Sequence, residues 1–255
     1  MQWFNVKDNL FERPNTTRST ESAFVKFGQT LGMAYFTQDF LDFFKELAAN
    51  NHKDWFHANK KRYEASVKDP FKLFVQDMID RAAEVDDRFA GEAKNAIFRI
   101  NRDVRFSKDK SPYKLQMGAV ISPGGKKEGM GIPGMYLELS PEHFRFYSGL
   151  YMPQKDVLYQ VREYIVKNPK ELDKLVSDKE FVSKFGELRG EKNKVLPKEF
   201  KEAAEKQPFL FNKQFYFFAS MPPETILRDD LADVIMEHFQ ASEPMRKFLT
   251  KARGL

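Results

Sequence analysis

The stretch Ile97–Lys114, IFRINRDVRFSKDKSPYK, separates two patterns of hydrophobicity along this chain. Before it, apolar residues recur with the period of a helix, and after it they alternate with polar residues as in strands. The surrounding segment Lys94–Lys127, which we call the basic segment, contains nine Lys or Arg and two acids, a net charge of +7. Since the whole chain of 255 residues carries a net charge of +5, its positive charge is concentrated here.

The residues before the basic segment predict three helices. The first follows Thr37, a residue typical of helix N-caps, and ends at Asn50-Asn51. A second is expected over about 53–66. The third begins at Asp69-Pro70, a capping residue followed by proline at the first helical position, and should stop near Asp86.

The residues from Ile97 onward predict a mostly antiparallel sheet and then more helices. Strands are expected at 97–101, 115–122, 135–140, 143–149 and 214–220, with a hairpin turn at Pro141-Glu142. Helices are expected at 155–168, 169–177 and 181–185, and as a pair after Asp229-Asp230. The order of N-terminal helices, a central mostly antiparallel sheet and C-terminal helices predicts the α+β class.

The first 35 residues differ from the rest of the chain. They contain a polar run at 15–22 and only scattered apolar residues, so we interpret 1–35 as an extension outside the domain. Nothing resembling a linker interrupts residues 36–255, which we therefore expect to form a single α+β domain.

The composition excludes several classes of function. The absence of cysteine excludes disulfides, thiolate metal sites and cysteine nucleophiles. Because no window approaches the roughly 18 apolar residues of a membrane span, and no signal peptide is apparent at the N-terminus, we expect a soluble, cytoplasmic protein without a membrane partner. A pI near 9.1 permits nucleic acid as a partner without requiring it.

Motifs for metals and cofactors are weak. The four histidines, His52, His57, His143 and His238, do not have metal-ligand spacing, so we predict no metal site. The run Gly129–Gly134 fits the Gly-x-Gly-x-x-Gly pattern of dinucleotide loops. However, proline at 133 removes a donor and a strand follows instead of a helix. We interpret it as a hairpin loop and predict no cofactor.

The basic segment is the strongest indication of a site. Its three arginines recur at a spacing of three, and arginine offers a planar fork suited to phosphate or carboxylate. The residues predicted to bind an anion are Arg99, Arg102, Arg105, Ser107, Lys108, Lys110, Tyr113 and Lys114. The ligand expected is an anionic small molecule or a phosphate group.

Three other interpretations of the same residues stay open. Nucleic acid could bind the patch, with Phe106 and Tyr113 stacking on bases. An enzyme could use Asp103 or Asp109 as a base and Tyr113 as an acid, although nearby arginines should depress the pKa of both carboxyls. Alternatively, the arginines pair with carboxylates in a structural network. The sequence assigns no catalytic residue and no oligomeric state.

The same residues carry a resemblance to a known family. The matching motifs are Phe40-Leu-x-x-Phe44, Leu47–Phe56, Asn59-Lys60, Tyr63-Glu64, Arg99–Lys114, Gly149–Pro153 and Phe185–Lys192. They resemble the domain of unknown function 2461 over roughly Phe36 to Leu249. A departure is Lys206-Gln207-Pro208, where such proteins often have Asp-His-Pro. The resemblance implies one intracellular α+β domain and supplies no catalytic residues.

Overall fold

The computed structural model describes residues 34–125 and 131–255, and Ala34–Leu255 form one compact unit. The α-helices are α2 (Gln38–Ala49), α3 (Lys53–Ala58), α4 (Lys60–Tyr63), α5 (Asp69–Val85), α6 (Ala93–Ala96), α8 (Lys155–Lys167), α9 (Pro169–Val176), α10 (Lys179–Phe185), α11 (Lys201–Lys206), α12 (Leu231–Ala241) and α13 (Glu243–Ala252). A π-helix, η1 (Glu64–Lys68), precedes α5. The 3₁₀ turns are η2 (Asp87–Phe89), η3 (Lys198–Phe200), η4 (Pro208–Phe211) and η5 (Pro223–Leu227).

The sheet is antiparallel throughout, in the order β1-β2-β3-β4. Its strands are β1 (Met117–Ile121), β2 (Met135–Leu139), β3 (Phe144–Leu150) and β4 (Phe215–Met221). Helices α2 to α6 precede the sheet in the chain, α8 to α11 lie between β3 and β4, and α12 and α13 follow β4. This order confirms the predicted α+β class.

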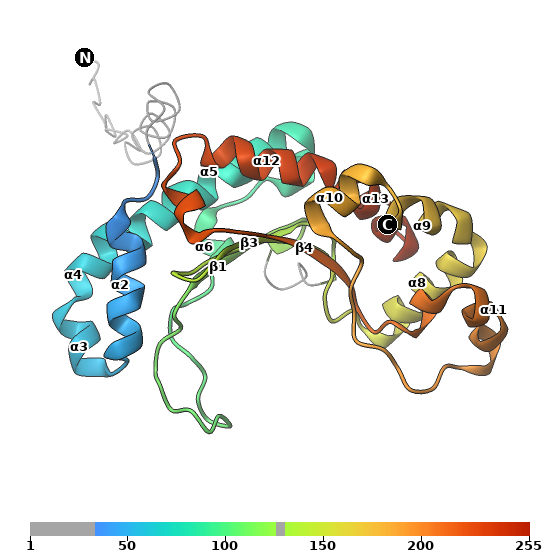
Figure 1. Ribbon diagram of the computed structural model, residues 1–255, viewed down its shortest axis with the longest axis horizontal. Helices are drawn as coiled ribbons and strands as arrows, with labels where there is room; N and C mark the ends of the chain where they lie inside the picture. The colour runs from blue at the N-terminus through green and yellow to red at the C-terminus, as the bar shows by residue number, and fades with distance from the viewer. Residues whose placement is uncertain (1–33, 126–130) are drawn as a thin grey trace, which may run out of the picture. The chain divides into compact units, whose positions relative to one another are not determined.

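One face of the sheet packs against helices and forms the core. In β2, β3 and β4 every second residue is buried on this face, as the period of two requires, except that Met221 at the end of β4 is half-buried. Helices α5, α6, α10 and α13 contact the sheet, and Figure 1 shows α5 and α12 running across the same side. Many of the largest fully buried side chains are phenylalanines, which explains the abundance of this residue in the chain.

The opposite face of the sheet, which we call the open face, lacks such a cover from the described residues. Within the described residues no helix is drawn across it in Figure 1. Its side chains in β2–β4 are half-buried or exposed, whereas their neighbours along the strand are buried. They are Tyr136, Glu138, Arg145, Tyr147, Tyr216, Phe218 and Ser220.

The predicted second and third helices are continuous in space rather than separate. The second divides at Asn59, whose side-chain amide donates to the carbonyl of Trp55 at 2.9 Å and competes with the helical ladder. The predicted third helix is confirmed as α5, which begins at Asp69 and ends at Val85, but Asp69 does not cap it, because η1 leads directly into α5. The proline is tolerated there because it lies in the first turn of α5.

The predicted strand at 97–101 is also wrong. The segment makes single bridges only, Ile97 with Ala119 and Asn101 with Tyr113. It leaves the edge of β1 after Phe98 and pairs with its own returning limb, since Lys114 N–H donates to Ile100 and Arg102 N–H donates to Pro112. The basic segment therefore forms a two-limbed loop beside the sheet.

The other predicted strands and helices are confirmed to within a few residues. The short helices α6 and α11 had no expected counterpart. In the described part of the chain, no helix combines the length and apolarity needed to cross a membrane.

Candidate functional site

The two-limbed loop of the basic segment is fixed to the helical core by contacts between Asn51 and Tyr113. The Asn51 side chain donates to the Tyr113 carbonyl at 3.0 Å and accepts from the Tyr113 N–H at 3.1 Å. The Tyr113 ring stacks on Phe56 with centroids 4.0 Å apart and is only 5% exposed. Burial raises the pKa of the Tyr113 hydroxyl. Tyr113 therefore anchors the loop.

Two of the three predicted arginines are paired within the loop. Arg102 bonds to Asp109 and to the Ser111 carbonyl, and Arg105 bonds to Asp103 at 2.7 Å. Hydrogen bonds from Ser111, together with Arg102, hold the pKa of Asp109 well below its usual range. Arg105 lowers the pKa of Asp103 in the same way. Both carboxylates are therefore weak bases.

The remaining predicted residues differ in how they are held. Lys110 donates to the Val104 carbonyl at 2.9 Å, and Ser107 is half-buried nearby. Arg99 and Lys108 are exposed and make no hydrogen bond or ion pair with any residue in the described ranges. The residues 126 and 127, which end the basic segment, lie outside the described residues.

Lys114 is half-buried and close enough to Arg99 to feel its charge. Burial lowers the pKa of Lys114, and the positive charge of Arg99 lowers it further. The Lys114 ammonium lies 5.5 Å from the ring centroid of Phe98. Asp103, the carboxylate whose pKa Arg99 also lowers, is already bonded to Arg105. Within the described residues, neither Arg99 nor Lys114 forms an ion pair with a carboxylate, and Arg99 acts on Asp103 only through its charge.

Phe98 begins a line of rings across the open face, which sequence reasoning did not identify. We call Phe98, Tyr136, Tyr147 and Phe218 the aromatic row. Successive ring centroids are 6.0, 5.6 and 5.1 Å apart. The line follows from the register, because Tyr136 is paired with Tyr147 and Tyr147 with Phe218 on adjacent strands.

Cations lie at both ends of the aromatic row. Lys114 is placed over Phe98 at one end, and the guanidinium groups of Arg189 and Arg145 lie 4.4 and 5.6 Å from the Phe218 centroid at the other. Arg189 is held there by a hydrogen bond to the Phe185 carbonyl at 3.1 Å. Such contacts orient both the rings and the charges.

Glu138 lies beside the row with its charge compensated. Its carboxylate accepts from Gln116 at 2.6 Å and from the Tyr136 hydroxyl at 3.3 Å, and lies 2.8 Å from His143 and 3.7 Å from Arg145. Its side chain is only 12% exposed. Burial, and next the negative charge of Glu138, raises the pKa of Tyr136. Four polar partners thus surround one carboxylate on this face.

The signal for this surface was present in the sequence but incomplete. Tyr136 and Glu138 alternate with core residues in one strand, and Arg145 with Tyr147 in the next. The alternation predicts that each pair shares a face. It does not predict which residues of other strands lie beside them, because that depends on the register.

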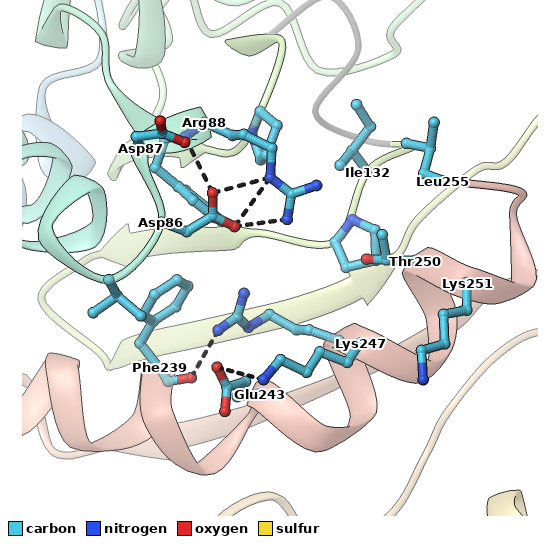
Figure 2. A pocket seen from close by; sticks show the side chains of 15 residues that line it. Asp86, Asp87, Arg88, Ile132, Phe239, Glu243, Lys247, Thr250, Lys251 and Leu255 are labelled. Carbon is cyan, nitrogen blue, oxygen red and sulfur yellow. Dashed lines mark hydrogen bonds and ion pairs between the residues drawn. The ribbon is translucent and has the colours of Figure 1, made fainter.

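A separate pocket of about 630 Å³ lies between η2 and α13 (Figure 2). Its charges are mostly paired: Arg88 with Asp86 at 2.7 Å, and Lys247 with Glu243 at 3.1 Å. Arg246 is buried over the Phe239 ring, which lowers its pKa to about 10. We interpret these residues as fixing α13 to the η2 turn.

Neither the loop nor the open face resembles a metal centre. Among the described residues, no group of three or more His, Cys, Asp or Glu side chains is placed to hold a metal ion.

Comparison with known proteins gives one match. A family model described as "Conserved hypothetical protein (DUF2461)" matches residues 39–248. Neither the curated proteins nor the solved structures contain a significant match. The match runs from the first turn of α2 into α13 and includes the basic segment and the whole sheet.

Proposed function

The chain belongs to the DUF2461 family of conserved hypothetical proteins, and from this starting point we propose that it binds an anion-bearing ligand at Arg99 and Lys114. The ligand carries phosphate or carboxylate groups, and the basic segment holds it at the edge of the open face. The residues favour binding over catalysis, because Asp103 and Asp109 have depressed pKa values and Tyr113 is buried in the core.

The observation that carries this proposal is that, among the described residues, neither Arg99 nor Lys114 forms an ion pair with a carboxylate, although Lys114 is half-buried over the Phe98 ring. The positive charge of Arg99 lowers the pKa of the half-buried Lys114, so the two cations repel each other when no anion is bound. An anion that contacts both groups would relieve this repulsion and gain charge-assisted hydrogen bonds. The two carboxylates of the loop, Asp109 and Asp103, are bonded to Arg102 and Arg105 instead.

Titration calorimetry with inorganic pyrophosphate tests the proposal. We expect binding by the full chain at low salt, and a loss of about tenfold or more in affinity in Arg99→Gln and in Lys114→Met. Charge-assisted hydrogen bonds contribute roughly 1.5–3 kcal/mol each, which corresponds to that factor. Citrate, titrated in parallel, distinguishes a carboxylate-binding site from a phosphate-binding one.

The matched control is Arg105→Gln, which removes an exposed guanidinium from the same loop that is already bonded to Asp103. Its affinity for pyrophosphate should stay within about twofold of the wild type, since a paired surface charge contributes little. If Arg105→Gln and Arg99→Gln lost the same amount of affinity for pyrophosphate, the loss would be an unspecific effect of net charge. Absence of binding to both anions would refute the proposal.

A further inference from the structure

We propose that the ligand is a single-stranded nucleic acid and that its bases stack along the aromatic row of the open face. This assignment rests on the anion site proposed above, because Arg99 and Lys114 would hold phosphates at the first end of the row. It adds the surface that recognises the rest of the ligand, namely Phe98, Tyr136, Tyr147 and Phe218.

Stacking is what four half-buried rings on an open sheet face can supply. Each ring is oriented by its neighbours at centroid distances of 5.1–6.0 Å. Rings fixed in this way lose little conformational freedom when a base lies on them. Any nucleobase has a flat π face, so such a row binds unpaired bases with little regard to sequence. Open antiparallel sheets with surface aromatics serve this purpose in RNA-binding modules.

The charges complement a polyphosphate backbone. Lys114 and Arg99 lie at one end of the row, and Arg145 and Arg189 at the other. The carboxylate near the middle, Glu138, is surrounded by Gln116, Tyr136, His143 and Arg145, so that its repulsion of phosphate is reduced. A strand that follows the row therefore meets cations at both ends, as a backbone-tracking surface requires.

The same features disfavour other occupants. In a duplex the flat faces of the bases are already covered by their neighbours, so the rings would have nothing to stack on. An acidic peptide would satisfy the cations but would leave the four rings without planar partners. A free mononucleotide could use one ring and one cation but would not require the whole row.

The test is fluorescence anisotropy with the full chain and a short labelled oligouridylate, compared with oligothymidylate, duplex DNA, inorganic polyphosphate and poly-glutamate. We expect both single strands to bind about tenfold or more tightly than duplex, polyphosphate or poly-glutamate. Tyr147→Leu and Phe218→Leu should each weaken oligouridylate binding by about tenfold, whereas Tyr147→Phe should retain it. Thermal melts establish that each variant is folded.

The salt dependence of oligouridylate affinity separates the contribution of base stacking from that of phosphate contacts. Arg189→Gln should reduce the steepness of the plot of log affinity against log salt by about 0.7, the value for one phosphate contact on a single strand. Tyr147→Leu should weaken binding at every salt concentration without changing that slope. Tyr159→Leu, which removes a surface tyrosine on α8, is the matched control and should bind like the wild type.

The outcomes distinguish this inference from the anion site. If oligouridylate binding needs Arg99 but tolerates Tyr147→Leu and Phe218→Leu, the anion site stands and the stacking surface is wrong. Equal binding of polyphosphate and oligouridylate leads to the same conclusion, and a preference for poly-glutamate would assign a peptide ligand instead. A dimer that dissociates on Tyr147→Leu would mean that a second copy covers the open face. If neither pyrophosphate nor any strand binds, both proposals fail.

Discussion

At the scale of single residues, one amide determines where the basic segment can be. Asn51 pairs with both backbone polar groups of Tyr113, as a neighbouring strand would, across 62 positions of sequence. The backbone of the returning limb is thereby satisfied although β1 has not yet begun. The stacking of Tyr113 on Phe56, the burial of Ile100 and the contacts to β1 also hold the loop beside the sheet.

Another single residue should make stability depend on pH. His238 packs against the rings of Phe146 and Phe185, and burial, with a further contribution from Lys184, lowers its pKa below the ordinary value of 6.5. As pH falls through that value, the unfolded chain takes up a proton that the folded chain resists. This group therefore favours folding at neutral pH, and the advantage is lost on acidification.

We accordingly predict that the stability difference between the wild type and His238→Gln shrinks as pH falls from neutral to about 5. Urea unfolding at a series of pH values measures this difference, and all other groups cancel in the comparison. Above the ordinary pKa of 6.5 the two stability curves should be parallel. Parallel curves over the whole range would show that His238 titrates equally in both states.

At the scale of elements, the pairing of β3 with β4 depends on a close approach at Gly149. Its φ is +115°, and a Cβ built there would lie 2.1 Å from the Phe215 carbonyl oxygen and 2.8 Å from the Tyr216 Cα. Both obstacles are backbone atoms of the paired strand, which cannot move without breaking the ladder. Only glycine fits this position.

Gly149→Ala should therefore destabilise the fold by about 2–5 kcal/mol, the combined cost of backbone strain and overpacking. The matched control is Gly125→Ala, at φ +63° with no atom within 4 Å of the new Cβ, which should cost about 1 kcal/mol. Urea denaturation of both variants gives the comparison. If both variants lost a similar amount of stability, the positive φ alone, and not the close approach of β4, would explain why glycine is needed at position 149.

At the scale of the whole molecule, we propose that Ala34–Leu255 is the folding unit. The residues Tyr35 and Phe36 belong to its core: Phe36 is 2% exposed and its ring lies 5.5 Å from that of Phe74, and the Tyr35 hydroxyl donates to the buried Asp77. These contacts join the start of the unit to α5 in the middle of the helical layer.

A chain that begins at Ala34 should melt cooperatively at the temperature of the full chain. A chain that begins at Thr37 should lose about 3–5 kcal/mol, the typical cost of deleting one large buried aromatic side chain, because it lacks Phe36 and the Tyr35 hydrogen bond. Calorimetry of the three chains makes the comparison. A lower melting temperature for the chain that starts at Ala34 would place part of the folding unit before that residue.

The sequence by itself determined the α+β class, most elements and the two faces of β2, β3 and β4. These features follow from the local periodicity of apolar and polar residues, for example the alternation of Tyr136 and Glu138 with core residues in one strand. It also located the cluster of positive charge at Arg99–Lys114, since charge is a property of composition.

Only the tertiary structure decided which of those cations are paired and which surface they adjoin. Arg105 and Arg99 are indistinguishable in sequence, yet Arg105 forms an ion pair with Asp103 and Arg99 forms none with any described residue. The aromatic row joins residues that are up to 120 positions apart, and the strand register that aligns them is set by the packed core on the other face. Long-range register is a property of the whole sheet, because each strand is positioned by its neighbours, so no local pattern could reveal it.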